Sequence, residues 1–179
     1  MIEPLLYFSS GFLMKLADDL ADDTTTRIAG AITGILCGAF VGLLVTISSD
    51  APYIFFGVFI GTLLAGKIDN LNHFLAGALF LLVALMGGLP VLEPVTLLVC
   101  VLGAFLDEFG HDRLQGGGYL SMIFEYRLIL KMGILALVIV PYFIVWIHGI
   151  GWCSFIFFLL FELSYEFTGR FDEHLLGSL

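Results

Sequence analysis

The chain has 179 residues, of which 60% are hydrophobic and only 13% are charged, and its formal net charge is −9. A mean hydropathy of +1.06 lies far outside the range of water-soluble domains of this size and predicts a membrane protein. With seven basic residues against sixteen acidic ones, the sequence offers no surface for nucleic acid. The apolar runs are continuous and not alternating, which favours helices, because a helix satisfies its own backbone hydrogen bonds in lipid.

Seven apolar segments are predicted as transmembrane helices, with charge clusters and Gly, Pro or Ser residues as boundaries. They cover residues 4–17, 27–48, 52–66, 73–91, 94–107, 130–148 and 151–168. The first segment has no basic region before it, so it is interpreted as a retained span and not as a signal peptide. We therefore expect an all-α integral membrane protein with about seven transmembrane helices.

Alternate threading of these spans places every basic residue on the same side of the membrane. The residues are Lys15, Arg27, Lys67, Arg113, Arg127, Lys131 and Arg170. Positive loops stay in the cytoplasm, so this side is predicted to be cytoplasmic. The N-terminus is then outside and the C-terminus is inside, and most acidic residues also fall on the cytoplasmic side.

Two pairs of segments indicate an internal duplication. Residues 13–23 align without gaps on residues 102–112, at an offset of 89, and residues 66–70 align on residues 169–173, at an offset of 103. Residues 1–89 and 90–179 are therefore predicted to be two parallel membrane repeats related by a pseudo-twofold axis along the membrane normal. The segment at about 73–91 is a connecting helix with no counterpart.

The second repeat is longer by an insertion at about 114–130. It begins with three consecutive glycines and continues with apolar and charged residues, a pattern that predicts a hinge and then a helix lying at the membrane interface. This helix is either a lid over a site or an inert surface helix.

Acidic motifs follow the short first and fifth spans. Residues i and i+4 share a helix face, so Asp18 with Asp22, and Asp107 with His111, can each point toward one site. Closely packed carboxylates repel one another unless a cation lies between them, so we expect Mg²⁺ or another divalent metal. The candidate metal ligands are Asp18, Asp19, Asp22, Asp69, His73, Asp107, Glu108, His111 and Asp172. Alternatively, these acids only keep the helix ends hydrated.

The last span carries charges on one face. Glu162, Glu166 and Arg170 follow one another at spacings of four residues on a helix rich in Phe and Leu. Ionisable groups within a membrane usually face a cavity, although an ion pair between Glu166 and Arg170 that locks two helices is an alternative. The candidate catalytic residues are Asp18, Asp22, Asp107, Glu162 and Glu166.

Residues 18–22 have the form D-D-x-x-D, and residues 107–112 are a variant of it. Two such motifs on duplicated helical halves resemble those of the UbiA-type intramembrane prenyltransferases. The resemblance implies that Asp18, Asp19 and Asp22, and Asp107 with His111, hold Mg²⁺ ions that grip a lipid diphosphate. Basic residues would assist the departure of the diphosphate, and the candidates are Lys67, Arg113, Lys131 and Arg170. The chain has fewer predicted helices than this family, and His111 replaces an acid.

We therefore expect a divalent-metal-dependent membrane enzyme that acts on a lipid (prenyl) diphosphate or lipid phosphate at the cytoplasmic face. A divalent-cation or proton-coupled transporter is one alternative, favoured by Glu162 and Glu166. A non-catalytic membrane subunit whose acidic face binds a basic partner is the other. Membrane lipid is the expected partner in each case, and the oligomeric state stays open.

Overall fold

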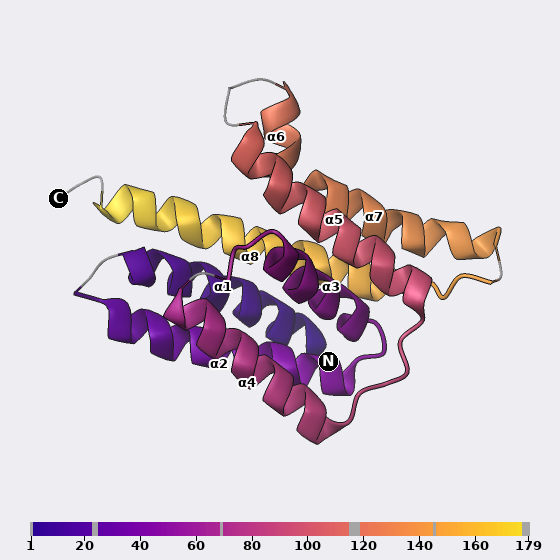
Figure 1. The fold of residues 1–179 in the computed structure, drawn as a ribbon, viewed down its shortest axis with the longest axis horizontal. Coiled ribbons are helices and arrows are strands. Elements are labelled where there is room, and N and C mark those ends of the chain that lie inside the picture. Colours follow the sequence, from indigo (N-terminus) through magenta and orange to yellow (C-terminus); the bar gives the residue numbers. More distant parts are fainter. Residues whose placement is uncertain (1, 23–24, 69, 115–118, 145, 177–179) are drawn as a thin grey trace. The chain divides into compact units, whose positions relative to one another are not determined.

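The computed structural model describes residues 2–22, 25–68, 70–114, 119–144 and 146–176, with the backbone alone at 22, 119–120, 125 and 171–176. Over these residues the chain forms eight α-helices and one short 3-10 helix, without a strand, which confirms the all-α prediction (Figure 1). The elements are α1 (Glu3–Asp22), α2 (Arg27–Ile47), α3 (Ala51–Leu64), α4 (Leu71–Gly87), α5 (Pro94–Arg113), α6 (Tyr119–Glu125), α7 (Leu128–Ile139), η1 (Val140–Tyr142) and α8 (Trp152–Leu176).

These helices belong to two compact units. The first unit comprises Met1–Ser48, Asp69–Leu89 and Ile156–Leu179, and the second comprises Ser49–Ile68 and Pro90–Phe155. The first unit therefore contains α1, α2, α4 and most of α8, whereas the second contains α3, α5, α6 and α7. Each unit thus combines segments that are far apart in the sequence.

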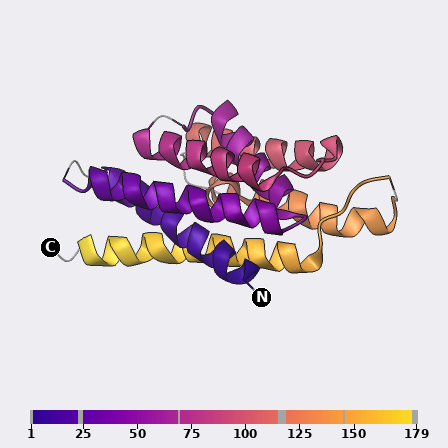
Figure 2. The ribbon, with the colours of Figure 1, turned by 90° about the horizontal axis from the view of Figure 1, so that it is seen from below.

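In the first unit, glycines on α2 allow close packing against its neighbours. Gly34, Gly38 and Gly42 face α4, and a Cβ atom added at Gly42 would lie 2.6 Å from Cβ of Val83. One turn earlier, Gly30 faces α1 in the same way. Small residues spaced by four let helix backbones approach closely, which is the usual basis of helix association in membranes. Figures 1 and 2 both show α2 beside α1 and α4.

The same unit contains a close crossing of α1 and α8 (Figure 2). A Cβ atom at Gly11 would collide with the carbonyl oxygen of Phe161 and with Oγ of Ser164. The Ser164 hydroxyl donates a hydrogen bond of 2.8 Å to the carbonyl oxygen of Phe8. Gly11 is therefore required for this approach, because any side chain would push the two helices apart.

In the second unit, α5 packs against α3 on one side and α7 on another. A Cβ atom at Gly57 would collide with Cβ of Cys100, and one at Gly61 would lie 2.7 Å from Cβ of Ala104. Gly103 makes a similarly close approach to Leu130 of α7. The α3–α5 packing thus again depends on glycine.

The N-terminus of α5 is capped by Glu93. Its carboxylate accepts hydrogen bonds from the backbone N–H groups of Val95 (3.0 Å) and Thr96 (2.7 Å) and from the Thr96 hydroxyl (2.8 Å). The Thr96 hydroxyl also lies 2.6 Å from the carbonyl oxygen of His148, to which it donates. This cap lies at the opposite end of α5 from its acidic motif.

Two of the described helices, α2 and α5, are long and apolar enough to cross a membrane. The helices α3 and α4, and the segment Leu128–Tyr142, are apolar but shorter. The predicted span 130–148 ends early, because α7 stops at Ile139 and Pro141 in the following 3-10 turn cannot continue an α-helix. Conversely, α1 and α5 continue as helices through their acidic motifs.

Candidate functional site

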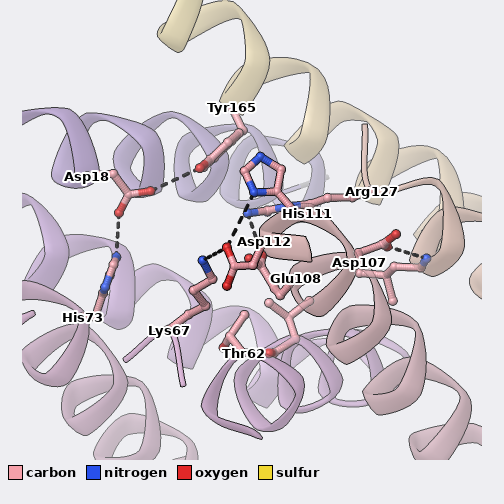
Figure 3. Close-up of polar contacts among 12 residues, drawn as sticks. Asp18, Thr62, Lys67, His73, Asp107, Glu108, His111, Asp112, Arg127 and Tyr165 are labelled. Atoms are coloured by element: carbon pink, nitrogen blue, oxygen red, sulfur yellow. Dashed lines mark hydrogen bonds and ion pairs between the residues drawn. The ribbon is translucent and has the colours of Figure 1, made fainter. Parts of the chain in front are cut away.

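Three helices of the first unit bring polar side chains together at Asp18. One carboxylate oxygen lies 2.7 Å from Nε2 of His73 on α4, and the other accepts a hydrogen bond of 3.2 Å from the hydroxyl of Tyr165 on α8 (Figure 3). We call Asp18, His73 and Tyr165 the Asp18 triad. Because an ionised carboxylate can only accept, Nε2 carries the hydrogen in this arrangement.

Neighbouring contacts fix the helices that carry the triad. The side-chain amide of Asn72, next to His73, donates to the carbonyl oxygen of Ala17 at 3.3 Å, which ties the start of α4 to α1. Ser164, next to Tyr165, ties α8 to α1 through its bond to Phe8. The triad is therefore held by an adjacent hydrogen bond on each side.

A cation balances the carboxylates of this region. Nζ of Lys15 lies 2.7 Å from Oδ1 of Asp19, one turn further along α1, and 5.8 Å from the ring centroid of Tyr165. Gly169 of α8 packs against the Lys15 side chain, where a Cβ atom would lie 2.6 Å from its Cε. Asp19, a predicted metal ligand, is thus paired with lysine in this structure.

In the second unit, Asp107 serves as a helix cap. Its two carboxylate oxygens accept hydrogen bonds from the backbone N–H groups of Ile129 (3.1 Å) and Leu130 (2.7 Å), in the first turn of α7, and the residue is 1% exposed. Such N–H groups at a helix start have no partner within the helix, and a carboxylate satisfies them well. Asp107 is therefore engaged by backbone N–H groups of α7.

The turn before α7 is strained and held by charge. Arg127 has a φ of 47°, a left-handed conformation that is unfavourable for a residue with a side chain. Its guanidinium lies 3.0 Å from Oε1 of Glu108, which follows Asp107 on α5. Two consecutive acids of the second motif thus stabilise the same turn.

The remaining predicted residues of the second unit make other contacts. Nζ of Lys67 lies 2.5 Å from Oδ1 of Asp112, and Nδ1 of His111 lies 3.9 Å from the same oxygen (Figure 3). The guanidinium of Arg113 lies 4.5 Å from the ring centroid of Phe109. Separately, Lys131 donates a hydrogen bond of 2.6 Å to the carbonyl oxygen of Tyr126.

Not all predicted ligands can be placed. Asp69 and the side chains of Asp22 and Asp172 lie outside the described residues. Within the part of the chain that is described, no group of three or more His, Cys, Asp or Glu residues is arranged to hold a metal ion. The predicted divalent-metal site stays a prediction.

The charged face of α8 differs along its length. Glu162 is buried with 5% of its surface exposed, Glu166 is partly exposed and Arg170 is exposed. A buried carboxyl group on an otherwise apolar helix is costly and calls for polar surroundings. Glu162 is therefore well shielded from the surroundings of the protein, unlike Glu166 and Arg170 on the same helix face.

Sequence reasoning missed two residues of these clusters, Tyr165 and Arg127. Tyr165 stands in a run of aromatic residues and nothing in its spacing distinguishes it. Arg127 was recognised only as a basic residue of the insertion. Its proximity to Glu108 could have been suspected, because an acid and a base on adjoining segments often pair.

The Asp18 triad is chemically versatile. A carboxylate that accepts from a histidine ring nitrogen fixes the tautomer and orientation of the ring, as in many acid–base and metal sites. The tyrosine hydroxyl adds a further donor from another helix. The arrangement can hold a proton or bind a cation.

Comparisons with family models, with curated proteins and with solved structures found no match for the chain. The UbiA-type resemblance rests on the aspartate motifs alone.

Proposed function

We propose that the chain is a multi-pass membrane protein with its N-terminus outside and its C-terminus in the cytoplasm. The membrane assignment is supported by large apolar side chains that are exposed along α2, α5 and α8, while glycines lie at the helix crossings. On α2 they are Ile28, Ile32, Ile35, Leu36, Leu43 and Ile47. On α5 they are Val95, Leu98, Leu102, Leu106 and Phe109, and on α8 Trp152, Ile156, Leu159, Leu163 and Phe167. Stripes of this kind are unfavourable in water and favourable in lipid. The orientation is supported by the predicted placement of the basic residues on one side of the membrane.

We further propose that it is a divalent-metal-dependent enzyme acting on a lipid diphosphate or lipid phosphate at the cytoplasmic face. The single observation that carries this proposal is the convergence of Asp18, His73 and Tyr165 from three helices of an apolar unit. Such a convergence of ionisable groups marks a candidate site. The UbiA-type resemblance of residues 18–22 supports the same substrate class.

The donors present are compatible with Mg²⁺. This ion is usually held by one or two carboxylates, with substrate phosphates and water completing the octahedron, and not by an all-protein cage. Asp18 is one such carboxylate, and Asp22 follows it by one turn of the same helix. When bound, the ion would neutralise charge on the phosphate groups.

The residues of the chain would have separate tasks. Asp18 orients His73 through Nε2. The other ring nitrogen, Nδ1, is buried in this structure, so proton exchange between His73 and a substrate would require a movement that exposes Nδ1. Basic groups would bind the phosphates. Of the predicted candidates, Arg170 belongs to the same unit as Asp18 and His73, whereas Lys67, Arg113 and Lys131 belong to the second unit.

The test is hydrolysis or transfer of prenyl diphosphates and lipid phosphates by the purified protein in detergent. We expect activity that requires Mg²⁺, disappears with EDTA and falls at least about 100-fold in Asp18→Asn and His73→Gln, since removing a general acid–base typically costs about 100- to 10,000-fold. Glu3→Gln, at the other end of α1, is the matched control and should retain activity. Activity that survives EDTA and Asp18→Asn would contradict the proposal.

Transport is the second candidate, favoured by the burial of Glu162. It predicts that liposomes containing the protein take up Mn²⁺ or protons and that Glu162→Gln abolishes the flux, while Asp18→Asn only weakens it. The third possibility, a non-catalytic subunit, predicts neither activity nor metal binding by the isolated protein.

A further inference from the structure

Each proposed repeat contributes its third helix to the unit that contains the first helix of the other repeat. In the first unit α1 crosses α8, and in the second unit α5 crosses α3. In the alignment of the repeats, the offset of 89 makes Cys100 equivalent to Gly11, and the offset of 103 makes Ser164 equivalent to Gly61. The α1 crossing lies at Gly11 and Ser164, and the α5 crossing lies at Cys100 with Gly57 and at Gly61 with Ala104. The two crossings agree to within one helical turn, which supports the repeat and makes Asp18 and Asp107 equivalent positions.

These equivalent aspartates have different partners. Asp18 contacts two side chains, His73 and Tyr165, whereas Asp107 accepts two backbone N–H groups of α7. The position equivalent to Tyr165 is Thr62, whose hydroxyl donates to carbonyl oxygens of its own helix, at Val58 (2.9 Å) and Phe59 (3.1 Å). The hydroxyl of Thr62 therefore donates within α3.

The segments outside the repeat explain the rest of the difference. His73 lies on α4, the connecting helix, which has no counterpart in the second repeat. The insertion, in turn, has no counterpart in the first repeat, and it ends in the strained turn at Arg127 that places the first N–H groups of α7 beside Asp107. One added segment thus supplies Asp18 with a titratable partner, and the other gives Asp107 a structural one.

We infer that the two equivalent aspartates have different roles. Of these two positions, only Asp18, in the Asp18 triad, belongs to a reaction centre, whereas Asp107 is a structural cap that holds α7 on α5. This inference rests on the proposed function for the role of Asp18, but the role of Asp107 can be tested independently. It assigns no metal ion and no proton transfer to the second aspartate motif.

The experiment compares Asp18→Asn and Asp107→Asn in the full chain, purified in detergent, with Glu3→Gln as control. The first readout is the melting temperature. Asp107→Asn should lower it by about 5 °C or more, because the amide NH2 of asparagine cannot accept from one of the two backbone N–H groups and the bond to the other is no longer charge-assisted, while Asp18→Asn should shift it by less than about 2 °C. Equal shifts, or a larger shift for Asp18→Asn, would overturn the inference.

The second readout is Mn²⁺ binding followed by electron paramagnetic resonance. We expect the unaltered protein to bind one Mn²⁺ per chain. Asp18→Asn should weaken the Mn²⁺ affinity at least tenfold, and Asp107→Asn should leave the affinity unchanged. Two ions, one of them lost in Asp107→Asn, would overturn the inference and leave the metal-dependent function standing. If the unaltered protein binds no Mn²⁺, the proposed metal dependence fails, and the melting temperatures still decide the role of Asp107.

Discussion

At the scale of single residues, the partner of a carboxylate decides what it can do. Asp18 and Asp107 stand in similar sequence contexts, yet one meets a histidine and a tyrosine and the other meets backbone N–H groups. A third carboxylate, Asp112, is paired with Lys67. The acidic residues that the sequence predicts as ligands of one metal site therefore have different partners in the structure.

Glu93 gives a prediction about pH. Hydrogen bonds from the Thr96 and Val95 backbone N–H groups, and from the Thr96 hydroxyl, hold the pKa of this carboxyl below its ordinary value of 4.5. Its stabilising contribution is therefore complete above about pH 4.5 and is lost as the pH falls through the lowered pKa. We expect Glu93→Gln to lower the melting temperature at pH 7, with a difference from the unaltered protein that shrinks toward pH 3.

The measurement is thermal unfolding in detergent at several pH values between 7 and 3. Glu3→Gln, which removes a carboxylate without such a cap, should follow the unaltered protein at every pH. A difference for Glu93→Gln that stays constant down to pH 3 would show that ionised Glu93 is not the stabilising form.

The sequence predicted part of the candidate site. Asp18 and His73 were both expected metal ligands, and they do lie in contact. However, the i and i+4 rule relates residues of one helix only, whereas this contact joins residues 55 positions apart on two helices. Tyr165 could not be found, because its role depends on how α8 crosses α1.

At the scale of helices, apolar segments predicted most elements well. The expected segments 27–48 and 52–66 correspond to α2 and α3 within about two residues at each end. The prediction of one helix over 130–148 is wrong because it rests on hydropathy alone. Pro141 cannot continue an α-helix, although the residues around it are apolar. The glycines of α2 were visible in the sequence, but which helix they face was not.

The glycine positions of α2 yield a prediction about packing. A Cβ atom at Gly38 would collide with the carbonyl oxygen of Ala76, which is backbone and cannot move aside easily. Gly38→Ala should therefore destabilise the protein by about 1–3 kcal/mol, the usual cost of overpacking. At Gly133 on α7 the nearest atom is 3.4 Å from an added Cβ, so Gly133→Ala should be neutral or slightly stabilising.

These two alanine variants can be compared by thermal unfolding in the same detergent. If Gly38→Ala melts at the same temperature as Gly133→Ala, the close packing of α2 on α4 is wrong.

At the scale of the whole molecule, the composition supports the proposed membrane assignment, and the placement of the basic residues supports the proposed orientation. The cysteines allow the orientation to be tested with the natural sequence. Cys153 is exposed in the first turn of α8, on the side proposed to be outside, whereas Cys37 and Cys100 are buried. We expect a membrane-impermeant maleimide added to intact cells to modify Cys153 alone, and Cys153→Ser to abolish the labelling.

Labelling of Cys153 only after the membrane is permeabilised would reverse the proposed orientation. Labelling of Cys37 or Cys100 in the folded protein would instead contradict their burial, and denatured protein provides the positive control for all three thiols.

The crossing of α1 with α8 has a consequence for biosynthesis. The ribosome makes α1 before α8, so Gly11 cannot contact Phe161 and Ser164 until α8 has been translated. During that interval Asp18, near the end of α1, lacks the hydrogen bond from Tyr165. A premature stop codon before α8 would therefore leave α1 without both the packing at Gly11 and the Tyr165 hydroxyl, and we expect such a truncated protein to be unstable.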